Sequence, residues 1–219
     1  MRAAVLGTKG YDRRFLSEAN AARGHDLVFL EPRLDITTAP LAVGCGAVCV
    51  FVNDSVDARV LELLAGLGVR LVALRCAGFN NVDLAAAERL AIDVVRVPAY
   101  SPHAVAEFTI GLMLAVDRHI PRAWARVRDN NFALDGLIGR NLHGRTVGVV
   151  GTGKIGALVA RSLRAGFGCE VLASDVVADP ELEAIGVRYV SRASLLEQAE
   201  IVTLHCPLTP ETRHLIDAA

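Results

Sequence analysis

The sequence predicts an α/β protein made of two successive parallel β-sheets with helices packed on them. Three observations support this fold class. Strand-like and helix-like segments alternate through the first hundred residues, a proline-bounded break at Pro98–Pro102 interrupts them, and a β-branched run at Thr146–Val150 enters a glycine-rich turn. We therefore expect one domain over residues 1–100 and a second over residues 101–219.

Repeated strand–helix units account for the first domain. Short Val/Leu-rich runs favour strands, and longer segments with helical apolar spacing favour helices. Because each strand is followed by a helical crossover, the strands should form one parallel sheet. The expected elements, in alternation, are Ala3–Leu6, a helix from about Asp12 to Arg23, Leu27–Leu30, Ala47–Val52, a helix from about Val56 to Leu67, Arg70–Leu74, Leu84–Leu90 and Val94–Val97.

A helix should lead from the break into the second domain. Ser101 is a suitable N-cap, Pro102 suits the first turn, and apolar periodicity continues from Val105 to Val116. Pro121 then either kinks this helix or starts another segment that contains Trp124.

The turn after Thr146–Val150 has the pattern of a dinucleotide-binding βα turn. Gly151 permits the tight turn, Gly153 allows backbone to approach a pyrophosphate, and Gly156 allows the helix to pack on the strand. The next strand, Cys169–Asp175, ends on a carboxylate 19 residues after Gly156, where it can accept hydrogen bonds from a ribose diol. A turn that serves only packing leaves this order of features unexplained.

Only about four parallel strands are expected in the second domain, which is half of a doubly wound dinucleotide-binding (Rossmann) sheet. Strand Ile201–Leu204 should pair beside Val147–Val150 and form an exposed edge. The elements expected after Asp175 are a helix at Pro180–Ile185, a strand at Val187–Val190, a helix at Ser191–Gln198 and the strand Ile201–Leu204.

Composition excludes several classes of partner. The 23 basic and 24 acidic side chains give a net charge of −1, and no Lys/Arg run offers a track for nucleic acid. No apolar stretch reaches the ~18 residues of a membrane span and no signal-peptide pattern is present, so we expect a cytoplasmic protein without membrane partners. The five scattered cysteines lack ligand spacing, so we expect free thiols and no metal.

Three further segments resemble the D-isomer-specific 2-hydroxyacid dehydrogenase family, in its order and near its spacing. They are Arg75–Asp83, Val97–Glu107 and Leu204–Thr212. The chain is most similar to the D-lactate dehydrogenase branch, which Asn130–Gly139 and His143–Gly148 also resemble, and the similarity covers essentially the whole chain. The resemblance implies a flavodoxin-like substrate domain over residues 1–100 and the first half of an NAD-binding Rossmann domain over residues 101–219.

The resemblance also implies a substrate site. The backbone N–H groups of Ala77 and Gly78 would hold the carboxylate of a small 2-keto or 2-hydroxy acid, and Tyr100 would line the pocket. A tight turn after a buried strand and an inter-domain core position are the competing interpretations of these residues. Arg75 could supply charge to this site or pack structurally, and the sequence leaves this open.

In the second domain the resemblance assigns Lys154 and Ile155 to the pyrophosphate and Asp175 to the adenosine ribose. It assigns Cys206, Pro207 and Thr212 to the remainder of the nucleotide. A carboxylate at Asp175 repels a 2′-phosphate, so NAD is favoured over NADP.

The chain departs from the family pattern at His103 and Phe108, which affects the prediction of the exact substrate. The family's catalytic Arg, Glu and His belong to segments beyond Ala219, so no catalytic residue is expected here. His205 is expected to be structural. We therefore expect a C-terminally truncated, inactive portion of a dehydrogenase that is a homodimer when full length.

Two other interpretations remain. An NAD(H)-sensing, corepressor-like binding protein would use the same fold without the reaction. A relative of formate or phosphoglycerate dehydrogenases is disfavoured by Tyr100 and by the segment Asn130–Gly139. The resemblance to the D-lactate dehydrogenase branch implies pyruvate and D-lactate as the substrate pair.

Overall fold

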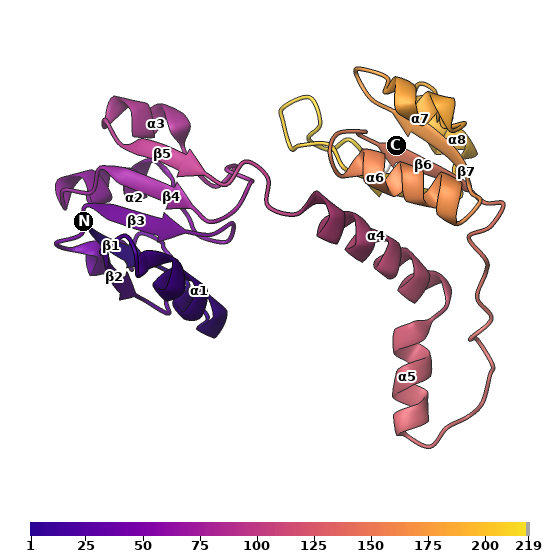
Figure 1. Cartoon of the computed structure of the whole chain (residues 1–219), viewed down its shortest axis with the longest axis horizontal. Helices are drawn as coiled ribbons and strands as arrows, with labels where there is room; N and C mark the ends of the chain where they lie inside the picture. Colours follow the sequence, from indigo (N-terminus) through magenta and orange to yellow (C-terminus); the bar gives the residue numbers. More distant parts are fainter. Residues whose placement is uncertain (218–219) are drawn as a thin grey trace. The chain divides into compact units, whose positions relative to one another are not determined.

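Short runs of Val, Leu and Ala form the buried strands of two separate parallel sheets in the computed structural model, which describes residues 1–217 (Figure 1). The chain divides into unit 1, which ends at Tyr100, and unit 2, which begins at Ser101. Each unit has its own core of buried aliphatic side chains. The α/β fold class predicted from the sequence is confirmed.

Unit 1 contains a five-stranded parallel sheet in the order β2-β1-β3-β4-β5. This order is that of flavodoxin-like sheets, as predicted. Asp57 and Asp83 cap two of its helices by accepting from the N–H groups of Val60 and Ala86. Its elements are β1 (Arg2–Val5), α1 (Gly10–Asn20), β2 (Asp26–Phe29), the 3-10 helix η1 (Ala39–Ala42), β3 (Ala47–Val50), α2 (Ala58–Gly66), β4 (Leu71–Leu74), α3 (Leu84–Arg89) and β5 (Asp93–Arg96).

Unit 2 contains a four-stranded parallel sheet in the order β8-β7-β6-β9. Val147 pairs with both Val171 and Ile201, so β9 lies beside β6 as predicted. Its elements are α4 (Pro102–Asp117), α5 (Ile120–Arg128), β6 (Thr146–Val150), α6 (Gly156–Arg161), the π-helical turn η2 (Ser162–Gly166), β7 (Glu170–Ser174), α7 (Pro180–Ala184), β8 (Arg188–Tyr189), α8 (Arg192–Gln198) and β9 (Ile201–Leu204).

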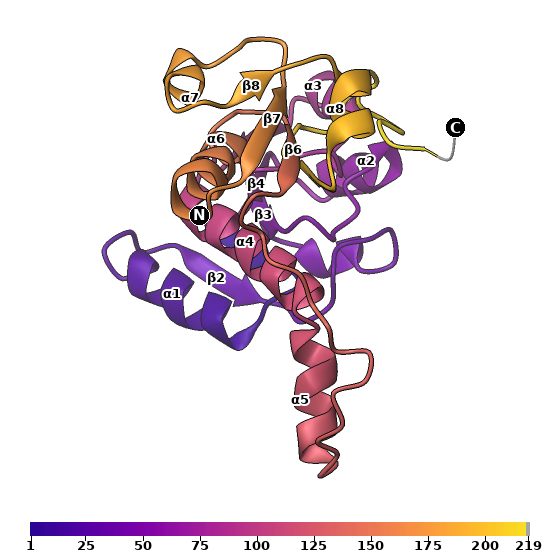
Figure 2. The ribbon, with the colours of Figure 1, turned by 90° about the vertical axis from the view of Figure 1, so that its right-hand side faces the viewer.

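Helix α4 packs beside α6 and adds Ala106, Met113 and Leu114 to the core of unit 2, whereas α5 lies away from the sheet (Figures 1 and 2). Ser101 caps α4 by accepting from the N–H of Ala104 at 3.4 Å, as predicted. His119 then adopts a left-handed conformation with φ of 50°, and α5 starts at Ile120. Pro121 therefore belongs to the start of a new helix, which decides between the two alternatives that the sequence left open.

Arg164 connects the π-helical turn η2 to neighbouring segments of unit 2. Its guanidinium donates to the carbonyl oxygens of Ile185 at 3.2 Å and Cys169 at 3.1 Å, and it pairs with Glu170. The side chain therefore ties the π-helical turn to the segments on either side of β7. None of the helices within residues 1–217 has the length and apolar character needed to cross a bilayer.

Candidate functional site

The turn after β6 is closely packed because two of its glycines face backbone atoms. A Cβ on Gly156 would collide with the carbonyl oxygen of Gly151, and one on Gly151 would lie 2.8 Å from the amide nitrogen of Cys206. Gly151 also has φ of +89°, which L side chains rarely adopt. By contrast, nothing lies within 4 Å of a Cβ on Gly153, which leaves open space above this exposed part of the turn.

The remaining members of the glycine turn differ in exposure. Lys154 is exposed, whereas Ile155 is half-buried and packs against the core of unit 2. Gly156 starts α6, so these residues lie where the first N–H groups of a helix meet the open space above Gly153. Such N–H groups and a nearby lysine suit the binding of phosphate.

Asp175 follows β7 and is fixed next to the glycine turn. One carboxylate oxygen accepts from the N–H of Thr152 and from its hydroxyl at 3.0 Å, and the other accepts from the N–H of Val176. Burial alone would raise the pKa of Asp175, but these hydrogen bonds, with one from Val177, lower it overall. The group is therefore a carboxylate at neutral pH and is oriented before any ligand binds.

The loop after β9 completes the edge of the site. Cys206 is half-buried against Gly151, and Pro207 is exposed. The hydroxyl of Thr212 closes this loop, because it donates to the carbonyl oxygen of Pro207 at 2.6 Å and accepts from the N–H of Thr209 at 2.7 Å. Cys206, Pro207 and Thr212 therefore belong to one loop at the C-terminal end of β9, and this loop packs against the glycine turn through Cys206.

His205 lies in the same loop but has no carboxylate partner. Its Nε2 is 3.0 Å from the hydroxyl oxygen of Thr203, and burial lowers the pKa of its imidazolium. The ring of His143 likewise contacts a carbonyl oxygen, that of Phe167 at 3.2 Å. These two imidazoles therefore contact neutral oxygen atoms of the protein.

In unit 1 the segment after β4 presents unused backbone donors. The N–H groups of Ala77 and Gly78 donate no hydrogen bond within residues 1–217. Their carbonyl oxygens are held from behind, because Arg96 donates to that of Ala77 at 2.8 Å and the thiol of Cys76 donates to that of Gly78 at 3.3 Å. Two free N–H groups on a fixed turn suit an anionic ligand such as a carboxylate.

Tyr100 is exposed and Cys76 is buried. Tyr100 is 69% exposed at the end of unit 1, so it is not a core residue of that unit. Cys76 is buried, and burial raises the pKa of its thiol. Cys76 is therefore a neutral thiol at pH 7 and a hydrogen-bond donor within the turn.

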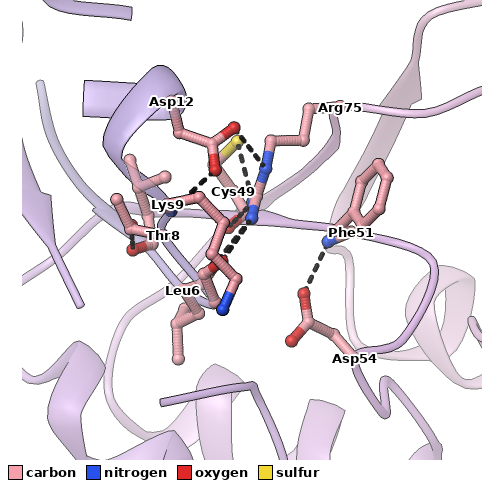
Figure 3. A network of polar contacts seen from close by, with 10 residues as sticks. Leu6, Thr8, Lys9, Asp12, Cys49, Phe51, Asp54 and Arg75 are labelled. Carbon is pink, nitrogen blue, oxygen red and sulfur yellow. Dashed lines mark hydrogen bonds and ion pairs between the residues drawn. The ribbon is translucent and has the colours of Figure 1, made fainter. Parts of the chain in front are cut away.

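Arg75 has the structural role that the sequence left undecided. Its guanidinium pairs with Asp12 at 3.3 Å and donates to the carbonyl oxygens of Leu6 at 2.7 Å and Cys49 at 3.2 Å (Figure 3). It thereby connects the ends of β1, β3 and β4. Within residues 1–217 its guanidinium forms no hydrogen bond or ion pair with Ala77 or Gly78.

Three residues that support these sites were missed in the sequence analysis. Thr152 orients Asp175, Tyr189 donates to the hydroxyl of Thr152 at 2.9 Å, and Arg96 holds the turn at Ala77. A hydroxyl inside the glycine turn was the only local signal for Thr152. The partners of Tyr189 and Arg96 are distant in sequence, so no spacing rule could identify them.

Comparisons with known proteins agree with this geometry. Residues 110–219 match the sequence model of the NAD binding domain of D-isomer specific 2-hydroxyacid dehydrogenases. A 2-hydroxyacid dehydrogenase homolog of Zymomonas mobilis is 52% identical over 99% of this chain. The D-lactate dehydrogenase of Escherichia coli is 49% identical over 100% of it. The chain spans 66% of the length of each of these two relatives.

Solved structures give the same result. The apo-structure of D-lactate dehydrogenase from Escherichia coli matches 99% of this chain with a TM-score of 0.90, at 49% identity and over 68% of that protein. D-lactate dehydrogenase from Aquifex aeolicus, complexed with NAD and lactic acid, matches 96% of this chain with a TM-score of 0.82, at 31% identity and over 62% of that protein. The predicted cofactor, NAD, is confirmed, and the chain belongs to the D-isomer specific 2-hydroxyacid dehydrogenase family.

Proposed function

We propose that this chain is part of an NAD-dependent oxidoreductase that interconverts pyruvate and D-lactate. Residues 1–100 would form the substrate domain and residues 101–219 the NAD-binding domain. The observation that carries the proposal is Asp175, which is fixed by Thr152 beside an open glycine turn. Family membership and the free N–H groups at Ala77 and Gly78 support the same activity.

The residues of unit 2 would bind the cofactor, which supplies a hydride to the keto carbon when bound. Gly151 and Gly156 allow the turn to pack closely, and the open space at Gly153 would receive the pyrophosphate, with Lys154 and Ile155 beside it. Asp175 would accept hydrogen bonds from the adenosine ribose. Cys206, Pro207 and Thr212 would border the rest of the nucleotide at the end of β9.

The residues of unit 1 would bind and orient the acid. The N–H groups of Ala77 and Gly78 would donate to its carboxylate, and Tyr100 would line the pocket. The N–H of Val97 donates to the carbonyl oxygen of Cys76 at 3.2 Å, and Arg96 donates to that of Ala77. These bonds fix the peptide planes that carry the N–H groups of Ala77 and Gly78, so both groups keep their direction in the absence of substrate. Such preorganised donors favour binding because little conformational freedom is lost.

We further propose that a polypeptide of residues 1–219 alone binds NAD without reducing pyruvate. The family reaction uses an imidazole as acid and base. His205 is the histidine nearest to the nucleotide edge, and it is bonded to Thr203 rather than to a carboxylate. Measurable NADH oxidation by this polypeptide with pyruvate would contradict this proposal.

Cofactor choice tests the proposed function directly. Asp175 should make NADH bind about tenfold or more tightly than NADPH, because a carboxylate repels a 2′-phosphate. Asp175→Ala should narrow this preference, and the control Glu197→Ala, which changes an exposed carboxylate on α8, should leave it unchanged. Fluorescence titration with both nucleotides measures the effect, and equal affinities in the unmutated chain would count against the proposal.

The exposed side of α4 and α5 supports a proposed homodimer of the full-length enzyme. Large apolar side chains are exposed along both helices and in the segment that follows, which suits burial against a second copy. They include Phe108, Leu112, Val116, Ile120, Trp124 and Phe132. Trp124→Glu should lower the dimer fraction measured by sedimentation, whereas Arg59→Glu on α2 should not.

A further inference from the structure

A cavity in unit 1 lies apart from the Ala77–Gly78 turn and from the glycine turn of unit 2. It has a volume of about 220 Å³ and is lined by residues that follow the C-terminal ends of β1, β2, β3 and β4. Figure 3 shows four of the lining residues, Lys9, Phe51, Asp54 and Arg75, which come from three of these strand ends. Ala77 and Gly78 do not line it.

The topology of the sheet explains why a cavity forms there. Strand β1 lies between β2 and β3, so the chain leaves β1 toward one edge of the sheet and later returns to its other side. The loops after β1 and β3 therefore diverge above the sheet. Open parallel sheets bind ligands at such a switch point, outside the carboxyl ends of their strands.

The charges around the cavity are mostly positive and only partly neutralised. Lys9, Arg33 and Arg75 contribute three cations, of which Arg75 alone has an ion-pair partner within residues 1–217, the buried Asp12. Isolated exposed cations are ordinarily solvated, but these three line the same concavity.

Asp54 is the one carboxylate in this lining, and it forms no ion pair with Lys9 or Arg33 within residues 1–217. Its carboxylate oxygens accept from the N–H groups of Leu34 at 2.7 Å and Phe51 at 2.5 Å. The carboxylate therefore fixes the two loops and adds one negative charge to the lining, which keeps a net positive charge from Lys9, Arg33 and Arg75. Tyr11 and Asn53 add a hydroxyl and an amide to the same lining.

We propose that this cavity is a binding site for a phosphate group, with Lys9 and Arg33 as its principal ligands. Its volume corresponds to about seven water molecules in the liquid, which accommodates a phosphate with a few attached atoms and excludes a dinucleotide. Lys9 and Arg33 would donate charge-assisted hydrogen bonds to the phosphate oxygens. The site is distinct from the keto-acid turn and from the NAD site of unit 2.

Amide chemical shifts of the ¹⁵N-labelled chain, titrated with inorganic phosphate, test this proposal. Saturating NAD is present throughout, so that the glycine turn is occupied, and sodium chloride of equal ionic strength serves as the reference. We expect saturable shifts at Gly7, Lys9 and Asn53 that chloride does not produce. Shifts confined to Ala77–Gly78 or Gly151–Gly156, or equal shifts with chloride, would overturn the proposal.

Charge-removing variants make the test specific to the cavity. Lys9→Gln and Arg33→Gln should each weaken phosphate binding by about tenfold, because each removes one charge-assisted contact. Arg59→Gln is the matched control, since Arg59 is exposed on α2, outside the cavity. Equal weakening in the control, or stronger binding of acetate than of phosphate, contradicts the assignment.

Folding and function are monitored separately in this experiment. The side chains of Lys9 and Arg33 form no hydrogen bond or ion pair within residues 1–217. Apart from the cavity signals, the spectra of Lys9→Gln and Arg33→Gln should therefore resemble the spectrum of the unmutated chain. NADH affinity reports on unit 2 and should not change. A failed phosphate site therefore leaves the proposed dehydrogenase function intact, and failure of NAD binding leaves the cavity in unit 1 testable.

Discussion

The turns after β1 and β6 have similar sequences and very different surroundings. The first reads Gly7-Thr-Lys-Gly10, and the second reads Gly151-Thr-Gly-Lys-Ile-Gly156. Both begin with a glycine at positive φ, +62° at Gly7 and +89° at Gly151. Yet a Cβ on Gly7 would meet only side chains, the nearest being Arg75 at 3.6 Å, whereas one on Gly151 would meet the backbone of Cys206 at 2.8 Å.

The difference comes from the neighbouring strand. In unit 2 the loop after β9 crosses directly over the turn, so only backbone fits there. In unit 1 the loop after β3 stays apart and leaves a cavity lined by side chains. The same strand–turn–helix unit can therefore present backbone N–H groups or cationic side chains to a ligand, and the adjacent loop decides which.

Alanine substitutions at the first residues of α1 and α6 should give the largest difference in stability between the turns after β1 and β6. Gly156→Ala puts a methyl group into the carbonyl of Gly151, so we expect a loss of about 1–3 kcal/mol in the free energy of unfolding and a loss of NADH affinity. Gly10→Ala meets nothing within 4 Å, so stability should stay the same or rise by less than about 1 kcal/mol. Urea denaturation and NADH titration measure both, and equal destabilisation would invalidate the contrast.

Valine substitutions at two open glycines should separate substrate binding from cofactor binding. A Cβ on Gly78 or on Gly153 meets nothing within 4 Å, so both variants should fold. In a catalytically competent protein that carries these residues, Gly78→Val should lower kcat/KM for pyruvate on the order of a hundredfold while NADH affinity is kept.

Gly153→Val should have the reciprocal effect, because its side chain fills the space proposed for the pyrophosphate. NADH affinity should fall, and stability should change little. Fluorescence titration and steady-state kinetics distinguish the two patterns. If Gly78→Val weakened NADH binding as much as Gly153→Val does, the assignment of the two turns to different ligands would be wrong.

The smallest expected effect is the pH dependence that His205 adds to unit 2. Burial lowers the pKa of His205 in the folded chain, so as pH falls below about 6.5 the unfolded chain binds a proton more readily than the folded chain. Stability should therefore decline from pH 7 toward pH 5, and His205→Gln should reduce this decline. The melting temperature of both proteins between pH 5 and pH 7 measures the effect, and an equal decline in His205→Gln would contradict the prediction.

The parallel arrangement of the strands was predictable because each strand is an apolar run with a helical segment after it, whereas the flavodoxin-like order of unit 1 was implied by the family resemblance. Parallel crossovers then allow few arrangements, and β9 beside β6 follows from the doubly wound pattern. Element ends were less predictable. The helix expected from Asp12 begins at Gly10, and the strand expected over Val187–Val190 is reduced to Arg188–Tyr189, because hydrogen bonding rather than apolar content sets these limits.

The candidate site was predictable only where its signal is local. The glycines and Asp175 belong to a pattern of fixed spacing. By contrast, Arg75 pairs with Asp12, and Tyr189 reaches Thr152 across 37 residues. Such contacts depend on how elements pack, which a single sequence does not specify.

The loop after β9 also has a consequence for the order in which unit 2 folds. The N–H of His205 donates to the carbonyl oxygen of Val150 at 2.7 Å, and Cys206 lies against Gly151. These contacts join segments more than fifty residues apart in the sequence. Contacts of such long range form slowly because a large loop must close first. The glycine turn, although its sequence is the most local signal in the chain, thus reaches its final geometry only when β9 has joined the sheet.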